Sequence, residues 1–183
     1  GSEVTSFAVL TDSETQIKYP LVDDAVLPDE ALLTPLFVKT SPPSVTAFSG
    51  MDVLVHALEA YVATAANNFT DALAQQAIEL VFEYLPKCHK PTATEQDRMS
   101  MHEASCLAGL SFNKAGLGIV HAMAHQLGGQ FHVPHGLANS MLLPYVIGFN
   151  CSHNPAVAKK YAHLSAKLGF AGHNASEVDK LAA

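Results

Sequence analysis

The sequence lacks several features that mark familiar protein classes. It has only three cysteines in 183 residues and no Cys-x-x-Cys pair, which excludes a disulfide framework and indicates a reducing compartment. Ten basic residues stand against seventeen acidic ones, and no basic run occurs. This balance argues against a nucleic-acid or anionic-membrane surface. No secretory signal opens the chain and no apolar stretch is long enough to span a bilayer, so we expect a cytoplasmic protein without nucleic-acid or membrane partners.

Nucleotide loops and activated nucleophiles are also missing. No Gly-x-Gly-x-x-Gly follows a strand-like run, and no Gly-Lys-Ser or Gly-Lys-Thr is present. The glycines that invite such a reading are expected at helix ends and at close helix contacts instead. They are Gly116, Gly118, Gly128, Gly129 and Gly136. Ser49, Cys88 and Cys106 have no histidine or aspartate at motif spacing, which disfavours nucleophilic catalysis.

The chain does contain many apolar residues, 49% of the total, which is enough to build a sizeable core. Its length suits one domain, or one domain with a short extra lobe. The chain begins Gly1-Ser2 without a methionine and stops inside what reads as an unfinished helix. We therefore expect these residues to be a piece of a larger protein.

Two compositional parts divide the chain near residue 41. Residues 4–11 and 16–22 are β-prone and flank the turn-forming run Asp12-Ser13-Glu14, which predicts a hairpin, and residues 31–33 are expected to form a third short strand. From the serine cap and prolines of Ser41-Pro42-Pro43 onward, apolar residues follow helical spacing. Helices are predicted over 44–64, 71–85, 95–115, 118–127, 136–149 and 155–168, with one more starting near Ser176. The prediction is a mostly α protein, with residues 1–40 β-rich and residues 41–183 all helical.

A first group of chemically distinctive residues lies on the first predicted helix. Asp52 and His56 are four residues apart, so their side chains share one face, about 40° apart around the axis. The surrounding run is otherwise apolar, and a buried aspartate and histidine without partners would be costly. Either a satisfied core pair or half of a metal site would explain them.

A second group is denser, because four of the ten histidines fall within residues 121–135. His121 and His125 are again four residues apart, as in the metalloprotease motif His-Glu-x-x-His, but Ala122 stands where that motif needs its glutamate. A protease of that type is therefore disfavoured. Together Asp52, His56, His121 and His135 could complete a divalent metal site of one carboxylate and three imidazoles, a set suited to zinc or ferrous iron.

At this point the chain resembles the iron-containing (group III) alcohol dehydrogenases, over almost its whole length. It is most similar to the alcohol dehydrogenases of ethanolamine and propanediol utilisation, or to the reductase half of bifunctional aldehyde–alcohol dehydrogenases. The segments that carry the resemblance are Gly50–Tyr61, His121-Ala-Met-Ala-His125-Gln-Leu-Gly, His135-Gly-Leu-Ala-Asn139, the opening Gly1–Thr5 and Lys18-Tyr19-Pro20. The family fold pairs a Rossmann-like domain with a helical one, so residues 1–40 would be the end of the nucleotide domain and 41–183 a helical metal-binding domain truncated at its C-terminus.

The resemblance implies roles for individual residues. The metal ligands would be Asp52, His56, His121 and His135. His125 would lie beside the nicotinamide and help to relay the alcohol proton, and a near-neutral pKa would let it pass that proton to solvent. The dinucleotide cleft would be lined by Thr5, Val9 and Lys18, together with His125, and Phe112 would form a wall of the substrate pocket.

The implied activity is reversible hydride transfer between a primary alcohol or aldehyde and NAD or NADP. The metal would polarise the substrate oxygen, and it would be Fe²⁺, with Zn²⁺ able to compete for the same ligands. The protein is expected to be a homo-oligomer, and the 183 residues by themselves are expected to be inactive. Two rivals stay open: a metal-dependent hydrolase or lyase with Glu59 or Glu103 as its base, and a non-catalytic metal-binding helical fragment.

Overall fold

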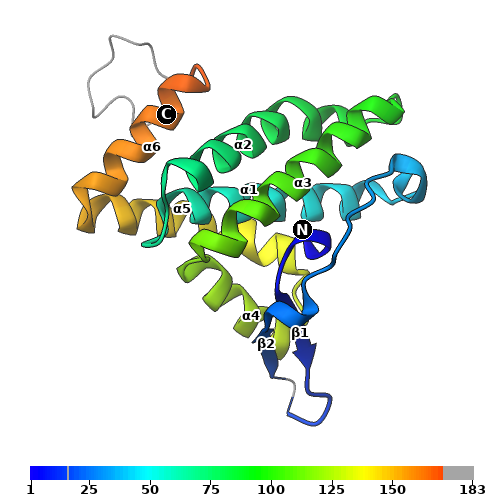
Figure 1. The fold of residues 1–183 in the computed structure, drawn as a ribbon, viewed down its shortest axis with the longest axis horizontal. Helices are drawn as coiled ribbons and strands as arrows, with labels where there is room; N and C mark the ends of the chain where they lie inside the picture. The colour runs from blue at the N-terminus through cyan, green and yellow to red at the C-terminus, as the bar shows by residue number, and fades with distance from the viewer. Residues whose placement is uncertain (16, 171–183) are drawn as a thin grey trace. The chain divides into compact units, whose positions relative to one another are not determined.

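The computed structural model describes residues 1–15 and 17–170, and these are mainly helical (Figure 1). Its regular elements are the strands β1 (Phe7–Thr11) and β2 (Lys18–Val22) and the helices α1 (Pro43–Val62), α2 (Asn68–Cys88), α3 (Glu95–Ala115), α4 (Ile119–Phe131), α5 (His135–His153) and α6 (Pro155–Lys167). The mostly α prediction is confirmed, and each of the six predicted helices is present within a few residues of its expected ends. The further helix expected from Ser176 lies outside the described residues.

The predicted hairpin is confirmed in shorter form. β1 and β2 pair antiparallel, with Phe7 opposite Val22 and Thr11 opposite Lys18. Asp12 organises the connection, because its Oδ1 accepts a hydrogen bond from the Glu14 backbone N–H at 2.8 Å. Contacts between β2 and α4 place the hairpin beside that helix (Figure 1).

The third strand expected at residues 31–33 is wrong. This stretch is irregular and leads into a short 3₁₀ helix, Pro35–Val38, which Thr34 caps by accepting from the Leu36 backbone N–H. Leu32 is 89% exposed. β-prone residues form a strand only when a partner strand can bond to them, and the prolines on both sides leave this stretch short.

Helices α1, α2 and α3 pack on one another and form the main core. Small residues allow the close approach; those exposed by 1% or less are Ala57, Ala60, Ala74, Ala77, Ala104 and Ala108. Asn67 and Thr94 form capping boxes at the starts of α2 and α3, which satisfy backbone N–H groups there. Ser41 does not cap α1 as expected; this helix begins after Pro42 without a side-chain cap.

The described chain divides into two compact units, Gly1–Leu142 and Leu143–Ala183, and the division runs through α5. The first unit holds the hairpin, α1 to α4 and the start of α5. In the second unit, α6 begins at Pro155 and is capped by Asn154, whose side chain accepts from two backbone N–H groups. The domains predicted at 1–40 and 41–183 follow a different criterion and stay a prediction.

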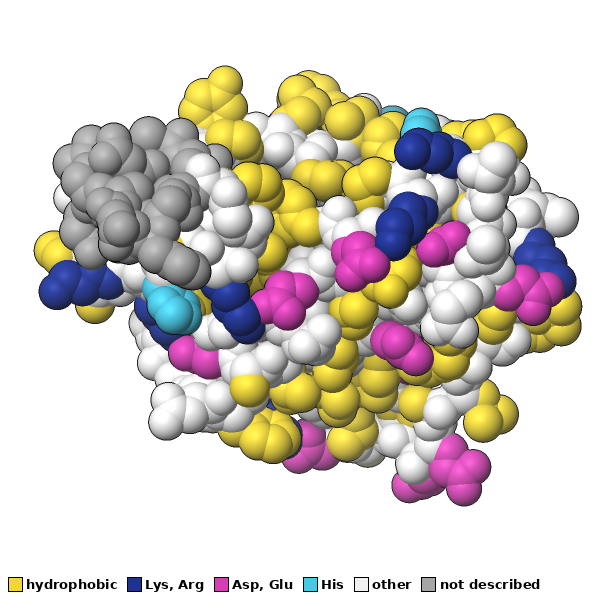
Figure 2. Space-filling view, turned by 90° about the horizontal axis from the view of Figure 1, so that it is seen from above, with side chains coloured by type: hydrophobic (Ala, Val, Ile, Leu, Met, Phe, Trp, Pro, Cys, Tyr) yellow, Lys and Arg dark blue, Asp and Glu magenta, His cyan; other side chains and the backbone are white. Residues whose placement is uncertain are grey.

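The surface carries many large apolar side chains. Figure 2 shows hydrophobic groups spread over one face, with acidic and basic groups scattered among them, so no continuous basic stripe occupies that face. Among the described residues, no helix combines the length and hydropathy that crossing a bilayer requires.

Candidate metal centre

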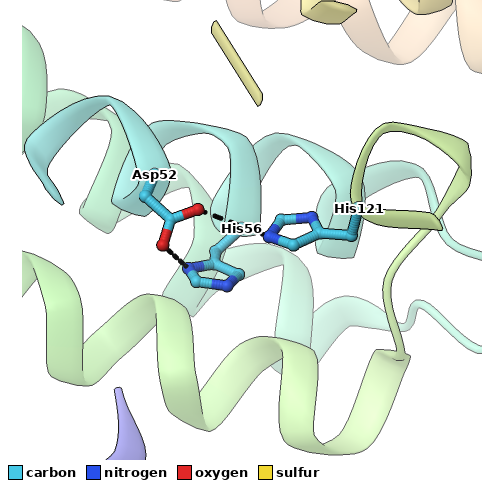
Figure 3. A group of neighbouring side chains, drawn as sticks. All are labelled: Asp52, His56 and His121. Carbon is cyan, nitrogen blue, oxygen red and sulfur yellow. Dashed lines mark ion pairs between the residues drawn. The ribbon is translucent and has the colours of Figure 1, made fainter. Parts of the chain in front are cut away.

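Four side chains that the sequence singled out lie together in the first unit. Asp52 and His56 come from the middle of α1, His121 from the first turn of α4, and His135 from the first residue of α5. Asp52 Oδ1 lies 3.5 Å from His121 Nε2 and 3.6 Å from His135 Nε2. Its other oxygen, Oδ2, lies 3.9 Å from His56 Nδ1. Figure 3 shows the Asp52 carboxylate facing the rings of His56 and His121.

Ring packing holds the imidazoles in place. The His56 ring stacks on His121 with 4.4 Å between centroids, and on Phe112 with 4.6 Å. His135 is tilted against His121 at 5.4 Å. Phe112 is buried and in turn meets Phe7 of β1 edge to face. Four helices and one strand therefore fix the orientation of these rings.

Asn139, one turn after His135 on α5, lies at the centre of this group. Its Nδ2 donates to Asp52 Oδ1 at 2.5 Å and lies 3.2 Å from the Nε2 atoms of both His121 and His135. Asn139 Oδ1 and His135 Nδ1 are buried without a hydrogen-bond partner among the described residues. A cation bound among these donors would displace the amide N–H from Asp52, because N–H hydrogens cannot face a cation.

Burial and charge act against each other at Asp52 and His56. Burial would raise the pKa of Asp52, but the hydrogen bond with His121 and the charges of His56 and His135 hold it well below its usual range. Burial lowers the pKa of His56 to about 3, although the Asp52 carboxylate opposes this. The pair therefore offers an anionic carboxylate and a neutral imidazole near neutral pH.

A second carboxylate, Glu59, holds His121 from the opposite side. Glu59 is 4% exposed, and its Oε2 lies 2.6 Å from His121 Nδ1. Burial would lower the pKa of His121, but its hydrogen bonds to Asp52 and Glu59 raise it. Burial would raise the pKa of Glu59, but its bond with His121 and the backbone N–H groups at the start of α4 lower it.

His125 lies one turn after His121 on α4, with its ring centroid 5.2 Å from that of His135. Burial, then the charges of His135, His121 and Lys18, lowers the pKa of His125 to about 4. The condition of a near-neutral pKa for this ring is therefore not met. At neutral pH this ring is uncharged and can accept a proton.

The other residues expected at the cofactor cleft have different environments. Lys18, on β2, places its Nζ beside Gly128 of α4, where an added Cβ would be 3.2 Å away. Thr5 is 2% exposed, whereas Val9 is 48% exposed on β1. Of these three residues, Lys18 is the one whose side chain lies against α4, the helix that carries His121 and His125.

A cavity of about 380 Å³ opens on the α1–α3 side of the centre. Asp52 and His56 form part of its wall, and Val45, Met101 and Ser105 contribute apolar and polar surface. Phe112, expected as a pocket wall, stacks on His56 and is not among the residues that line this cavity.

The donor set suits a divalent ion. One carboxylate and neutral imidazoles match the ligands that zinc and ferrous iron take in proteins. One ligand atom from each of Asp52, His56 and His121 lies within 4.8 Å of the others, close enough to face a shared ion. The unpartnered His135 Nδ1 and Asn139 Oδ1 also mark this region as incomplete in its hydrogen bonding.

Sequence reasoning gave no role at this centre to Glu59 or Asn139. Glu59 was considered only as the base of a rival hydrolase, and Asn139 only as part of a motif. Local patterns offered a weak indication: Glu59 is three residues beyond His56 and Asn139 four beyond His135, so each could share a face with a candidate ligand.

Comparisons with known proteins show to which family the chain is related. The chain is 52% identical over 181 residues to a 1-propanol dehydrogenase of Citrobacter freundii, covering 99% of this chain and 49% of that protein. It is 48% identical over 182 residues to an NADPH-dependent butanol dehydrogenase of Clostridium saccharobutylicum, covering 99% and 46%. A solved iron-containing alcohol dehydrogenase from Thermococcus thioreducens matches with a TM-score of 0.87 and 38% identity, covering 99% and 45%.

The chain spans about half the length of the curated relatives it matches. Residues 46–183 match the family model described as Fe-containing alcohol dehydrogenase family, C-terminal. These residues contain α1 from its first turn onward, and with it all four residues of the candidate centre. The chain belongs to the iron-containing alcohol dehydrogenase family, in the C-terminal, helical part of that fold.

Proposed function

We propose that the protein is a metal-dependent alcohol dehydrogenase that interconverts a small primary alcohol and its aldehyde with a nicotinamide cofactor. The observation that carries the proposal is the meeting of the Asp52 carboxylate with three imidazoles from α1, α4 and α5. Relatives named for 1-propanol and butanol dehydrogenation support the substrate class.

In this proposal Asp52, His56, His121 and His135 hold the ion. When bound, the ion would supply Lewis-acid polarisation of the substrate oxygen, which favours loss of the hydroxyl proton. The stacked rings of His56, His121 and Phe112 keep the donors oriented before any ligand arrives. Such preorganisation lowers the cost of assembling the site.

His125 is proposed to move the proton. Its ring lies near His135 and is uncharged at neutral pH, so it can accept a proton released during alcohol oxidation. Lys18 keeps positive charge close to this ring and opposes its protonation, which would speed onward transfer to solvent. Thr5, Val9 and Lys18 are proposed to contact the nicotinamide cofactor, and Phe112 to border the substrate.

The cavity beside Asp52 and His56 supports a small substrate, because about 380 Å³ admits a short alcohol. We propose Fe²⁺ as the ion on the strength of the family, with Zn²⁺ able to take the same ligands. NAD or NADP would be the hydride carrier. A cytoplasmic location is supported by three free thiols, and a homo-oligomer by the exposed apolar side chains.

A hydrolase or lyase would need a carboxylate free to activate a metal-bound water. Both oxygens of Glu59 are occupied by the start of α4, and Glu103 is exposed on α3. The geometry therefore favours the dehydrogenase over this rival.

The test is to load the full-length protein with Fe²⁺ or Zn²⁺, add NAD or NADP with propanol, and follow absorbance of the reduced nicotinamide. We expect reduction that needs both metal and alcohol. Turnover of an ester or phosphate without nicotinamide would support the hydrolase. Metal binding with neither activity would reduce the protein to a metal-binding one.

A further inference from the structure

Glu59 is a buried carboxylate that the proposed chemistry does not use. It lies on α1, three residues beyond His56, and is 4% exposed. Ionisable side chains are rarely buried without specific partners, because removing a charge from water is costly. The partners of Glu59 therefore indicate what its burial is for.

Both Glu59 oxygens bond to the start of α4. Oε1 accepts from the Val120 backbone N–H at 2.7 Å, and Oε2 accepts from the His121 backbone N–H at 3.4 Å. α4 has no side-chain cap of its own, because its N-cap residue is Gly118. A Cβ at Gly118 would be 2.7 Å from Glu59 Oε1, so the glycine makes room for the carboxylate. Glu59 thus caps α4 from another helix, where a negative charge is also favoured by the helix dipole.

The same carboxylate also bonds to the ring of His121. Glu59 Oε2 lies 2.6 Å from His121 Nδ1, a short, charge-assisted contact. A carboxylate accepts only, so Nδ1 carries a proton, and in the neutral ring that a metal ligand requires Nε2 is left with a lone pair. Asn139 Nδ2, a donor, lies 3.2 Å from that Nε2, which supports the same assignment independently. His121 Nε2 is also the atom that faces Asp52.

We propose that Glu59 is the positioning residue of the metal centre: it fixes the backbone, ring orientation and tautomer of His121 so that Nε2 faces the ion. The inference rests on the proposed metal site and adds the group that prepares it. Outer carboxylates that accept from a ligating histidine typically change metal affinity by about 10–100-fold when removed. A purely structural cap would stabilise α4 and leave metal affinity untouched.

Glu59→Gln separates these two roles. Glutamine keeps the shape and one acceptor oxygen, but it cannot accept from Val120 N–H and His121 Nδ1 through two separate oxygens. Ion-free protein is titrated with Zn²⁺ by calorimetry, and we expect the Kd of the variant to rise about 10–100-fold. A Kd within about twofold of the native protein, with only a lower melting temperature, would overturn the inference.

Two matched controls accompany the variant. Glu103→Gln makes the same chemical change on the exposed face of α3 and should leave the Kd unchanged. Asn67→Ala removes the cap of α2, a helix that carries no candidate ligand, and should lower the melting temperature without changing the Kd. An equal rise in Kd for Asn67→Ala would mean that affinity follows general stability, and would overturn the inference.

A measurement on the native protein needs no substitution. In Zn²⁺-loaded protein with isotope-labelled histidine, NMR should show the His121 proton on Nδ1 in a strong hydrogen bond and the metal on Nε2. The reverse arrangement would overturn the role of Glu59 even if Glu59→Gln failed to fold. If the native protein bound no Zn²⁺ or Fe²⁺ at all, the proposed metal site itself would be wrong, so the two failures are distinguishable.

Discussion

At the scale of single residues, Asp52 is the point at which three segments of the chain meet. Its two oxygens face imidazoles from α1, α4 and α5, and its pKa stays low despite burial because those rings and their hydrogen bonds favour the charged form. A neutral side chain of the same size would leave only neutral donors around a divalent ion. The charge of Asp52, more than its shape, is therefore what the centre requires.

Asp52→Asn tests this directly. The amide keeps the size of the side chain but removes the negative charge, so we expect metal content after dialysis to fall by more than the roughly 100-fold upper effect of losing an outer partner. Elemental analysis measures it. Asp29→Asn, on an exposed loop, is the matched control and should keep full metal content. Retained metal in Asp52→Asn would contradict the ligand assignment.

A second prediction at this scale concerns Gly136, which follows His135 and lies against the α1 backbone. A Cβ at Gly136 would fall well inside contact distance of the Phe48 carbonyl oxygen. Gly136→Ala should therefore cost about 1–3 kcal/mol of unfolding free energy and shift His135. Urea denaturation measures the cost. Gly148→Ala, in the same helix with open space around it, should be neutral or slightly stabilising.

At the scale of elements, the helices differ in how their first turns are satisfied. α2 and α3 have capping boxes built from neighbouring residues, whereas α4 begins at a glycine and receives Glu59 from α1. A cap from adjacent residues satisfies the first backbone N–H groups of a helix wherever the helix lies. A cap from another helix satisfies them only when the two helices are packed together. The helix that presents His121 and His125 is thus tied to the helix that presents Asp52 and His56.

Thr94→Ala should destabilise α3 by about 1 kcal/mol, because Thr94 Oγ1 accepts from the Asp97 backbone N–H at 3.1 Å. The midpoint of urea unfolding measures the change. Zn²⁺ affinity should stay the same, since the cap lies at the end of α3 far in sequence from the donors. A loss of Zn²⁺ affinity would show that the start of α3 and the metal centre are coupled.

The capping box of Thr94 and Asp97 also predicts that the stability of the protein depends on pH. Bonds from the Thr94 backbone N–H and hydroxyl lower the pKa of Asp97. A carboxyl whose pKa is lower in the folded state stabilises the protein above its ordinary pKa, about 3.9, and that contribution is lost as the pH falls through the lowered value. The difference in melting temperature between native protein and Asp97→Asn should be constant from pH 7 to about 5 and shrink below about 4. A difference that grows on acidification would contradict it.

At the scale of the whole molecule, every candidate metal donor belongs to the first compact unit, Gly1–Leu142, and none of the second unit's described residues takes part. A ligand that binds only the folded state stabilises what it holds together, by about 2.7 kcal/mol at one hundred times its Kd. The benefit should therefore fall on the first unit.

Hydrogen exchange with and without Zn²⁺ checks this expectation. Amides of α1 and α4 should exchange more slowly in the loaded protein, because the ion joins the two helices. Helix α6 carries no candidate ligand, so its amides serve as the internal control. Equal protection of α6 would mean that the ion stabilises the chain globally instead of through the first unit.

The sequence was enough to predict the six helices of the described residues, and its histidine pattern together with the family resemblance singled out the four side chains that meet at the centre. Helical periodicity and caps such as Thr94 act within a few residues, so they leave a readable local pattern. Asp52 with His56, and the dense histidine run, are also local patterns. The strand expected at residues 31–33 failed because strand formation depends on a partner that no local pattern guarantees.

Only the tertiary structure decided which atoms face each other. It brings Glu59 of α1 to the first turn of α4, and Asn139 of α5 between the Asp52 oxygen and two imidazoles. It also lowers the pKa of His125 to about 4 through burial. Such pairings join residues far apart in the chain, and their energies depend on burial and on distances of a few ångströms. No spacing along the sequence encodes those quantities, because they arise only when the helices pack.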